Sequence, residues 1–291
     1  MPLDHGYSEG PVRGLTNLAY TFGQLAHTGI NGVIIHKGTA TAFQDLLTPV
    51  APWPFLLHVS GSMALREPSE DSLRKVLLAN ALDAEELGAT AISIHVNLGN
   101  RHEDAMVEDL VSTVREAHGR DLPVLVMMYV RSWNGAKVIE RRDAKSIAAG
   151  ALAMAEAGAD IVKVSYPGDL DSCAEIVGGC FRPVLMAGGP PINNETVLDQ
   201  LKLWIEAGGT GGCLGRIVFS NDDAKGFLED AWKVLRNTPS KFSYPQFGDP
   251  SRRTYLGPDI DLREPGKLVE FSMRSTLGQW YPGATGFGTL S

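Results

Sequence analysis

Residues 143–166 read DAKSIAAGALAMAEAGADIVKVSY, and this stretch contains one complete helix-turn-strand unit. Apolar residues recur at helical spacing over Asp143–Ala157, which predicts an amphipathic helix. The turn Ala157-Gly158-Ala159 follows, where glycine supplies the left-handed conformation that ends many helices. Ile161–Tyr166 is apolar at nearly every position, as in a strand that is buried on both faces. The stretch therefore predicts one repeating unit of a parallel α/β sheet.

The same unit recurs between residues 30 and 236. Further strands are predicted at Gly32–His36, Phe55–Ser60, Ala91–Asn97, Pro123–Tyr129, Pro183–Ala187 and Gly212–Gly215. Further helices are predicted at Ser72–Leu87, Glu195–Ala207 and Asp222–Arg236. Strands that alternate with helices in this way predict the α/β class, and their number predicts a (β/α)8 TIM barrel.

The two ends of the chain depart from a regular barrel. Only Pro2-Leu3 stands before the Asp4-His5-Gly6 turn, so we expect a truncated first strand. Residues 1–236 form the predicted barrel domain, and residues 237–291 form a C-terminal extension rich in Pro, Gly and aromatic residues. Within it, Lys267–Arg274 alternates apolar and polar residues and fits a single half-buried strand. The extension either wraps the barrel or a neighbouring subunit, or it supplies the missing strand.

Composition excludes several classes of partner. The 291 residues carry a formal net charge of -8 and no Lys/Arg-rich run, which argues against nucleic acid or an anionic membrane as partner. The start lacks the basic and apolar regions of a secretory signal, and no apolar run approaches the ~18 residues of a membrane span. Three cysteines are too few and too irregular for a disulfide framework. We expect a cytoplasmic protein that acts on small molecules.

Barrels of this kind carry their active sites at the C-terminal ends of the strands. Lys163 is a candidate active-site residue because it lies in the predicted strand Ile161–Tyr166. A buried ammonium group is costly unless its pKa falls or it gains a partner. With a lowered pKa, Lys163 would be a nucleophile able to condense with a ketone. Alternatively, it pairs with Asp4 or another carboxylate, and the pattern leaves both possibilities open. Tyr129, also at a strand end, could move protons for such chemistry or could be a core tyrosine.

Other strand ends carry groups suited to substrate binding. Gly188 and Gly189 follow one strand, and Gly215 and Arg216 follow the next, in the usual barrel position for phosphate. The alternative for these glycines is turn chemistry alone. His36, His58 and His95 could hold zinc, but their spacing favours hydrogen bonds to substrate or to loops, and we expect no metal.

Eight motifs in order resemble the archaeal-type class I aldolase family. They are Pro2–Gly6, His36–Gly38, His58–Gly61, Ser93–Asn97, Met127–Tyr129, Asp160–Lys163, Ala187–Pro190 and Leu214–Arg216. The family includes fructose-bisphosphate aldolases, 2-amino-3,7-dideoxy-D-threo-hept-6-ulosonate synthases and the 2-amino-4,5-dihydroxy-6-oxo-7-(phosphooxy)heptanoate synthases of aminohydroxybenzoate pathways. This chain has Val130 and Ser132 where the family usually has proline and glycine.

The resemblance implies a role for each matched residue. Lys163 matches the Schiff-base lysine, Tyr129 the proton-shuttling tyrosine and Asp4 the aspartate near the lysine. Gly188, Gly189, Gly215 and Arg216 match the phosphate site. Polar residues at the strand ends are expected to bind substrate, namely His5, His36, His58, His95, Arg131 and Ser165. The resemblance further implies a homo-oligomer that needs no cofactor or metal.

The expected reaction joins a phosphorylated ketone to an aldehyde through a lysine Schiff base. The ketone unit is dihydroxyacetone phosphate or comes from a ketose phosphate, and the aldehyde is one such as aspartate semialdehyde. His58–Gly61 and Ser93–Asn97 are more similar to the heptulosonate synthases than to the fructose-bisphosphate aldolases. Three alternatives stay open: a fructose-bisphosphate-type aldolase, a thiolase-like relative, and a degenerate barrel that binds a phosphorylated ligand without catalysis.

Overall fold

A curled sheet of parallel strands forms the centre of the computed structural model, which describes residues 1–26, 28–47, 54–63, 65–190 and 192–241. The strands are hydrogen-bonded in the order β1-β2-β5-β6-β8-β9-β10. They comprise β1 (Val33–Ile35), β2 (Phe55–His58), β5 (Ala91–Leu98), β6 (Val124–Trp133), β8 (Ile161–Ser165), β9 (Val184–Ala187) and β10 (Gly211–Cys213). All seven strands predicted from the sequence are therefore confirmed.

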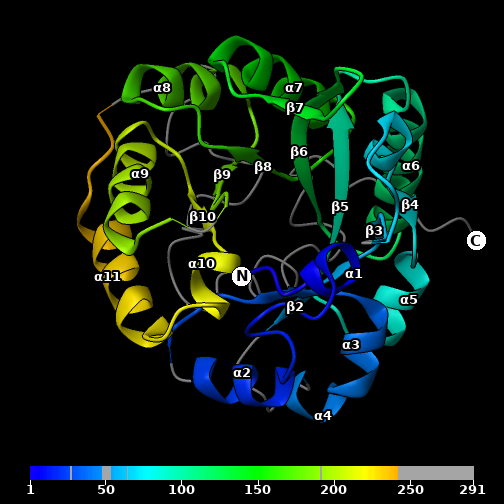
Figure 1. Cartoon of the computed structure of the whole chain (residues 1–291), viewed down its shortest axis with the longest axis horizontal. Coiled ribbons are helices and arrows are strands. Elements are labelled where there is room, and N and C mark those ends of the chain that lie inside the picture. The colour runs from blue at the N-terminus through cyan, green and yellow to red at the C-terminus, as the bar shows by residue number, and fades with distance from the viewer. Residues whose placement is uncertain (27, 48–53, 64, 191, 242–291) are drawn as a thin grey trace, which may run out of the picture.

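Helices surround this sheet on its outside, as Figure 1 shows. They are α1 (His5–Glu9), α2 (Leu18–Leu25), α3 (Lys37–Ala42), α4 (Gln44–Leu47), α5 (Ala81–Glu86), α6 (Glu103–His118), α7 (Ala144–Glu156), α8 (Leu170–Gly179), α9 (Asn194–Glu206), α10 (Arg216–Phe219) and α11 (Ala224–Asn237). Helices that alternate with parallel strands around a curled sheet confirm the predicted α/β TIM-barrel fold. No helix in the described part of the chain is long and apolar enough to span a membrane.

Asparagine and aspartate set where the outer helices begin. Asn80, Asp143, Asp169, Asn193 and Asp223 precede α5, α7, α8, α9 and α11 in turn. Each side chain accepts a hydrogen bond of 2.8–2.9 Å from the backbone N–H three residues later. Such a cap satisfies an N–H group that the helix itself leaves unpaired.

One predicted helix is wrong over most of its length. Instead of a helix over Ser72–Leu87, the chain forms a 3-10 turn at Glu70–Leu73, the short strand β4 (Val76–Leu77) and then α5. β4 pairs antiparallel with β3 (Ser60–Gly61), which directly follows the barrel strand β2. The apolar spacing fitted a helix, but Val76 and Leu77 are exposed, and pairing with β3 overrides the local pattern.

A second antiparallel pair extends the sheet at β6. That strand continues four residues beyond Tyr129 and pairs with β7 (Val138–Arg141), which the sequence analysis did not predict. Asn134-Gly135 lies in the connection, and Gly135 has a positive φ of 92°. An Asn-Gly pair between two strands is a strong hairpin signal, so the sequence did contain evidence for this element.

Two apolar cores follow from the alternation of side chains along the strands. The larger one packs the outer strand faces against the helices and includes Trp204 of α9, which is fully buried. The smaller one fills the barrel interior with Ile34, Leu56, Ala91, Leu125, Met127, Ile161 and Cys213. Because successive side chains in a strand face opposite sides, this inner core fixes which polar residues point into the barrel.

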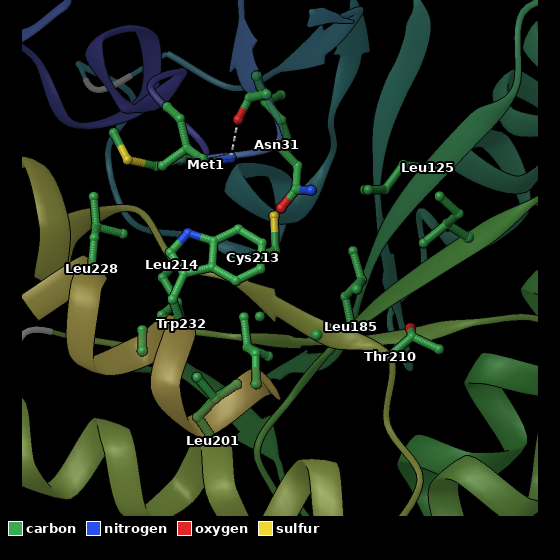
Figure 2. Close-up of a pocket in the computed structure, with 18 of the residues that line it drawn as sticks. Met1, Asn31, Leu125, Leu185, Leu201, Thr210, Cys213, Leu214, Leu228 and Trp232 are labelled. Carbon is green, nitrogen blue, oxygen red and sulfur yellow. Dashed lines mark hydrogen bonds between the residues drawn. The ribbon is translucent and has the colours of Figure 1, made fainter. Parts of the chain in front are cut away.

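The truncated first strand is confirmed. Pro2 forms a parallel bridge to Ile34, and the Met1 amine donates a 2.5 Å hydrogen bond to the Gly32 carbonyl. Next to this contact, an apolar cavity of about 140 Å³ lies among the N-terminal ends of the strands. Figure 2 shows Met1, Asn31, Cys213 and Trp232 around it. The cavity lies at the N-terminal ends of the strands, whereas the polar residues predicted to form the active site lie at the C-terminal ends.

The proposed boundary after residue 236 stays a prediction. Helix α11 ends at Asn237, and Lys241 donates a backbone hydrogen bond of 2.7 Å to the Glu206 carbonyl. Nearly all of the extension, including Lys267–Arg274, lies outside the described residues.

Asp160 ties the beginnings of β6 and β8 to helix α6. Its Oδ2 accepts hydrogen bonds of 2.8 Å from the Val124 backbone N–H and from His118 Nε2. The hydrogen bond to Asp160 raises the pKa of His118 above its ordinary value of 6.5, against the opposing effect of burial.

We expect this contact to make stability depend on pH. A raised pKa in the folded state stabilises the protein fully below pH 6.5, and the contribution disappears as pH rises through the raised pKa. His118→Gln should therefore reduce the free energy of unfolding at about pH 5.5 and much less at about pH 9. Because 44% of the His118 side chain is exposed, the effect should be about 0.2–1 kcal/mol. Urea unfolding at both pH values measures it, and an equal loss at both would contradict the assignment.

Candidate active site

Lys163 points into the barrel from the middle of β8. Its register partners are Met127 on β6 and Leu185 on β9, both members of or neighbours to the inner core. The side chain is 5% exposed, and Nζ lies 3.7 Å from the Met127 sulfur. The alternation that buries Ile161 inside the barrel also directs Lys163 and Ser165 inward.

The neighbours of Lys163 stabilise the protonated form of its amine. Burial by itself lowers the pKa of Lys163, but Cys213, Tyr129 and Asp4 outweigh it, and the net pKa is raised. Of the two possibilities that the sequence left open, the raised pKa favours the pairing of Lys163 with Asp4. Before Lys163 can act as a nucleophile, a neighbouring group must accept its proton.

Asp4 lies at the end of the truncated first strand, between two histidines. Its carboxylate oxygens are 3.4 Å from His5 Nδ1 and 3.5 Å from His58 Nε2. Burial raises the pKa of Asp4, but attraction from His58, His5 and Lys163 outweighs burial and lowers it. Asp4 is therefore an ionised carboxylate inside the barrel, as a partner or a proton acceptor for Lys163 requires.

His58 and His36 form the wall next to Asp4. His58 Nδ1 lies 2.8 Å from the Ser93 hydroxyl, and His36 Nδ1 lies 3.0 Å from the His58 carbonyl oxygen. The two imidazole rings are 5.0 Å apart. Burial lowers the pKa of His58 to about 3, with His36, Lys163 and Lys75 lowering it further against Asp4. His58 is thus a neutral hydrogen-bonding group.

His95 and Tyr129 form the opposite wall. Their rings lie 5.0 Å apart, and His95 Nε2 is 2.9 Å from the Asn97 side-chain oxygen. Tyr129 also lies close enough to Lys163 to help raise its pKa. Burial, followed by the charges of Lys75 and Arg131, holds the pKa of His95 well below its ordinary value. Tyr129 therefore lies between the lysine and a neutral, partly buried imidazole.

Arg131 and Ser165 converge on a residue that the sequence analysis missed, Glu140 of β7. Arg131 donates to Glu140 Oε2 from Nε at 2.8 Å and from Nη2 at 2.7 Å, and Ser165 donates to Oε1 at 2.8 Å. Arg131 also stacks 4.1 Å above the Tyr129 ring. Both expected substrate-binding residues are therefore engaged with protein, beside the tyrosine.

Lys75 is a second cation that the sequence analysis missed, because it lies within the wrongly predicted helix. It directly precedes β4, and its Nζ donates a 2.6 Å hydrogen bond to the Ser62 hydroxyl. Burial, and then repulsion from Arg131, lower the pKa of Lys75 to about 8. Its charge acts on both His58 and His95, so Lys75 lies near these two histidines.

The residues expected to bind phosphate gather on the other side, where β9 and β10 end. Arg216 Nη2 donates a 2.9 Å hydrogen bond to the Gly189 carbonyl, and Nη1 lies 3.3 Å from Glu9 Oε1. Gly189 has a positive φ of 64° with open space at its missing side chain. A side chain on Gly215 would stand 2.9 Å from His5 and Pro2, so only glycine permits this approach. The structure thus places Gly188, Gly189, Gly215, Arg216 and His5 in one region, at the ends of β9 and β10.

The histidines and acids of this site do not form a metal-ligand set. In the ranges that the structure describes, no three His, Cys, Asp or Glu side chains are grouped as potential metal ligands.

Comparisons with known proteins agree with this architecture. Residues 1–221 match the DeoC/LacD family aldolase profile. The 2-amino-4,5-dihydroxy-6-oxo-7-(phosphonooxy)heptanoate synthase of Streptomyces griseus is 29% identical over 247 residues, which cover 83% of this chain and 85% of that protein. The 2-amino-3,7-dideoxy-D-threo-hept-6-ulosonate synthase of Halobacterium salinarum is 28% identical over 221 residues, which cover 76% and 80%.

Solved structures give the same result. An archaeal fructose 1,6-bisphosphate aldolase superimposes with a TM-score of 0.73 at 27% identity, covering 81% of this chain and 92% of that one. A related structure at 27% identity and a TM-score of 0.72, with the same coverage, has its catalytic lysine covalently bound to the carbinolamine intermediate of the substrate. Fold, buried lysine and homology together define a class I aldolase, an enzyme of the lyase type. The chain belongs to the DeoC/LacD aldolase family.

We expect His58 to stay neutral between about pH 8 and pH 5, because burial opposes its protonation. Long-range ¹H–¹⁵N NMR spectra of the imidazole nitrogens report the charge directly. His118 provides an internal control, since its raised pKa should make it titrate above pH 6.5. A midpoint near 6.5 for His58 would show that the imidazole is accessible to solvent.

Proposed function

We propose that this aldolase joins a phosphorylated ketone to an aldehyde through a Schiff base on Lys163. The observation that carries the proposal is the burial of Lys163 inside the barrel, where Tyr129 and the ionised Asp4 both act on its pKa. The relative whose catalytic lysine is bound to a carbinolamine supports the same chemistry here.

The neighbours of Lys163 supply the proton transfers that the reaction needs. The Asp4 carboxylate takes the ammonium proton, and the neutral amine attacks the ketone carbon to give a carbinolamine. Loss of water, with a proton from Tyr129, leaves the iminium ion. Removal of a proton from the adjacent carbon gives an enamine, which attacks the aldehyde carbon while the new hydroxyl gains a proton. Water then hydrolyses the iminium and frees Lys163.

The ends of β9 and β10 supply the binding site for the ketone's phosphate in this proposal. Backbone N–H groups at Gly188, Gly189 and Gly215 can approach the anion closely, since no side chain intervenes. Arg216 already lies at Gly189, and a bound phosphate would replace Glu9 as its anionic partner. His5, His36, His58 and His95 supply ring nitrogens that can form hydrogen bonds with substrate hydroxyls.

The names of the relatives suggest the aldehyde. Both synthases make heptanoate or heptulosonate skeletons, which supports an aldehyde such as aspartate semialdehyde, whereas the archaeal aldolases act on fructose 1,6-bisphosphate. We therefore propose dihydroxyacetone phosphate, or an equivalent ketose-phosphate unit, with aspartate semialdehyde as the primary pair. Glyceraldehyde 3-phosphate is the alternative aldehyde.

Borohydride reduction with dihydroxyacetone phosphate tests the Schiff base. Intact-mass spectrometry should show one reduced adduct on the wild type, and peptide mapping should place it on Lys163. Lys163→Ala should form none and should lose activity by several orders of magnitude.

The same experiment distinguishes the alternatives. An adduct that persists in Lys163→Ala and maps to Lys75 would move the nucleophile to the lysine whose pKa is lowered. No adduct on a folded wild type would leave a barrel that binds a phosphorylated ligand without covalent chemistry.

We expect Arg216→Ala to raise the KM for dihydroxyacetone phosphate about 10- to 100-fold, because a charge-assisted hydrogen bond to the phosphate is lost. The KM for unphosphorylated dihydroxyacetone should not change. Steady-state kinetics with both ketones measures the difference, and Arg13→Ala is the matched control, since Arg13 is exposed and paired with Asp222. An equal effect on both ketones would assign Arg216 a structural role.

A further inference from the structure

Two antiparallel strand pairs stand beyond the barrel, one on each side of β5. The pair β3–β4 continues from β2, the pair β6–β7 continues from β6, and β5 lies between β2 and β6 in the sheet. Lys75 precedes β4 in the first pair. Arg131 and Glu140 face each other in the second. The two pairs therefore bring cations from two separate segments over the end of β5.

The cations in this region exceed the available carboxylates. Glu140 is shared by Arg131, Arg142 and the Ser165 hydroxyl. Lys75 has the Ser62 hydroxyl as its hydrogen-bond partner and forms an ion pair with no carboxylate among the described residues. The groups that act on Lys75 are Arg131 and Arg66, which repel it, and Asp4, which attracts it. The charge of Lys75 also acts on His58 and His95, and burial keeps both imidazoles neutral.

This cationic region lies on the far side of Lys163 from Arg216. Arg131 stacks on Tyr129, Tyr129 packs against His95, and the charges of Lys75 and Arg131 both act on His95. Arg216 instead contacts Gly189 and Glu9, where β9 and α1 end. A molecule that reacts at Lys163 with its phosphate at Arg216 would extend its other end towards Lys75.

We propose that Lys75, supported by Arg131 and Ser62, binds an anionic group on the aldehyde substrate and so selects acidic aldehydes. This inference rests on the proposed function, in which Lys163 forms the Schiff base with the ketone. Lys75 is partly buried and has no carboxylate partner among the described residues, so an anionic ligand would replace lost hydration with a charge-assisted hydrogen bond. The anion is a carboxylate or a phosphate, because either group accepts hydrogen bonds from an ammonium.

Matched pairs of aldehydes test the selection. One pair is glyceraldehyde 3-phosphate and glyceraldehyde, and the other is succinate semialdehyde and butanal. With dihydroxyacetone phosphate as the ketone, Lys75→Met should raise the KM for the charged member about 10- to 100-fold and leave the neutral member unchanged. Lys75→Arg should retain the preference, and Lys233→Met, on the exposed face of α11, should match the wild type. The pair that responds more strongly identifies phosphate or carboxylate as the preferred anion.

A pH profile of the wild type gives a second measurement that needs no variant. Lys75 has a pKa of about 8, so it is charged below that pH and neutral above it. The ratio of kcat/KM for the charged aldehyde to that for its neutral partner should fall above about pH 8. In Lys75→Arg the ratio should stay level, because arginine keeps its charge.

The outcomes separate this inference from the proposed function. If the wild type forms no adduct after borohydride reduction, the Schiff base itself is refuted. If the adduct forms but Lys75→Met weakens charged and neutral aldehydes equally, or the wild-type ratio is level with pH, Lys75 does not select the anion.

Discussion

The ammonium group of Lys163 is enclosed by the barrel, and the rest of the site follows from the need to accommodate it. Met127 and Leu185 flank it in the sheet and offer little compensation for the lost hydration. Asp4 supplies negative charge, although it comes from the N-terminal end of the chain, far from Lys163 in sequence. In the proposed reaction, this same carboxylate removes the proton of Lys163 when substrate enters.

His58 and His95, which lie near Lys163 and Asp4, provide polar contacts that carry no charge. Burial and nearby cations keep His58 and His95 neutral, so they can donate or accept hydrogen bonds without adding charge. Positive charge is instead concentrated at two separate places, Arg216 and the pair Lys75 and Arg131. A site with a neutral middle and two cationic ends fits a substrate that reacts at its centre and carries anions at its ends.

The second cationic end depends on a strand that continues past its usual limit. Val130 pairs with both Leu98 and Arg141, and Ser132 pairs with Ile139. Proline cannot donate to such a ladder, and glycine weakens it, so the residues that this chain carries at 130 and 132 suit an extended β6. The extension brings Glu140 to Arg131 and Ser165, and thereby orients the arginine over Tyr129.

The sequence by itself determined the barrel, the inward lysine and the strand ends, because these depend on local patterns: buried strands, glycine turns and period-two alternation. It also placed Asp4, Tyr129, Lys163 and the glycines at 188, 189 and 215 at one end of the sheet. Only the tertiary structure decided the net pKa of Lys163, since that depends on neighbours far away in sequence. It alone revealed Lys75 and Glu140, because β3–β4 and β6–β7 are formed by pairing between strands, and pairing overrode a helical pattern at residues 72–80.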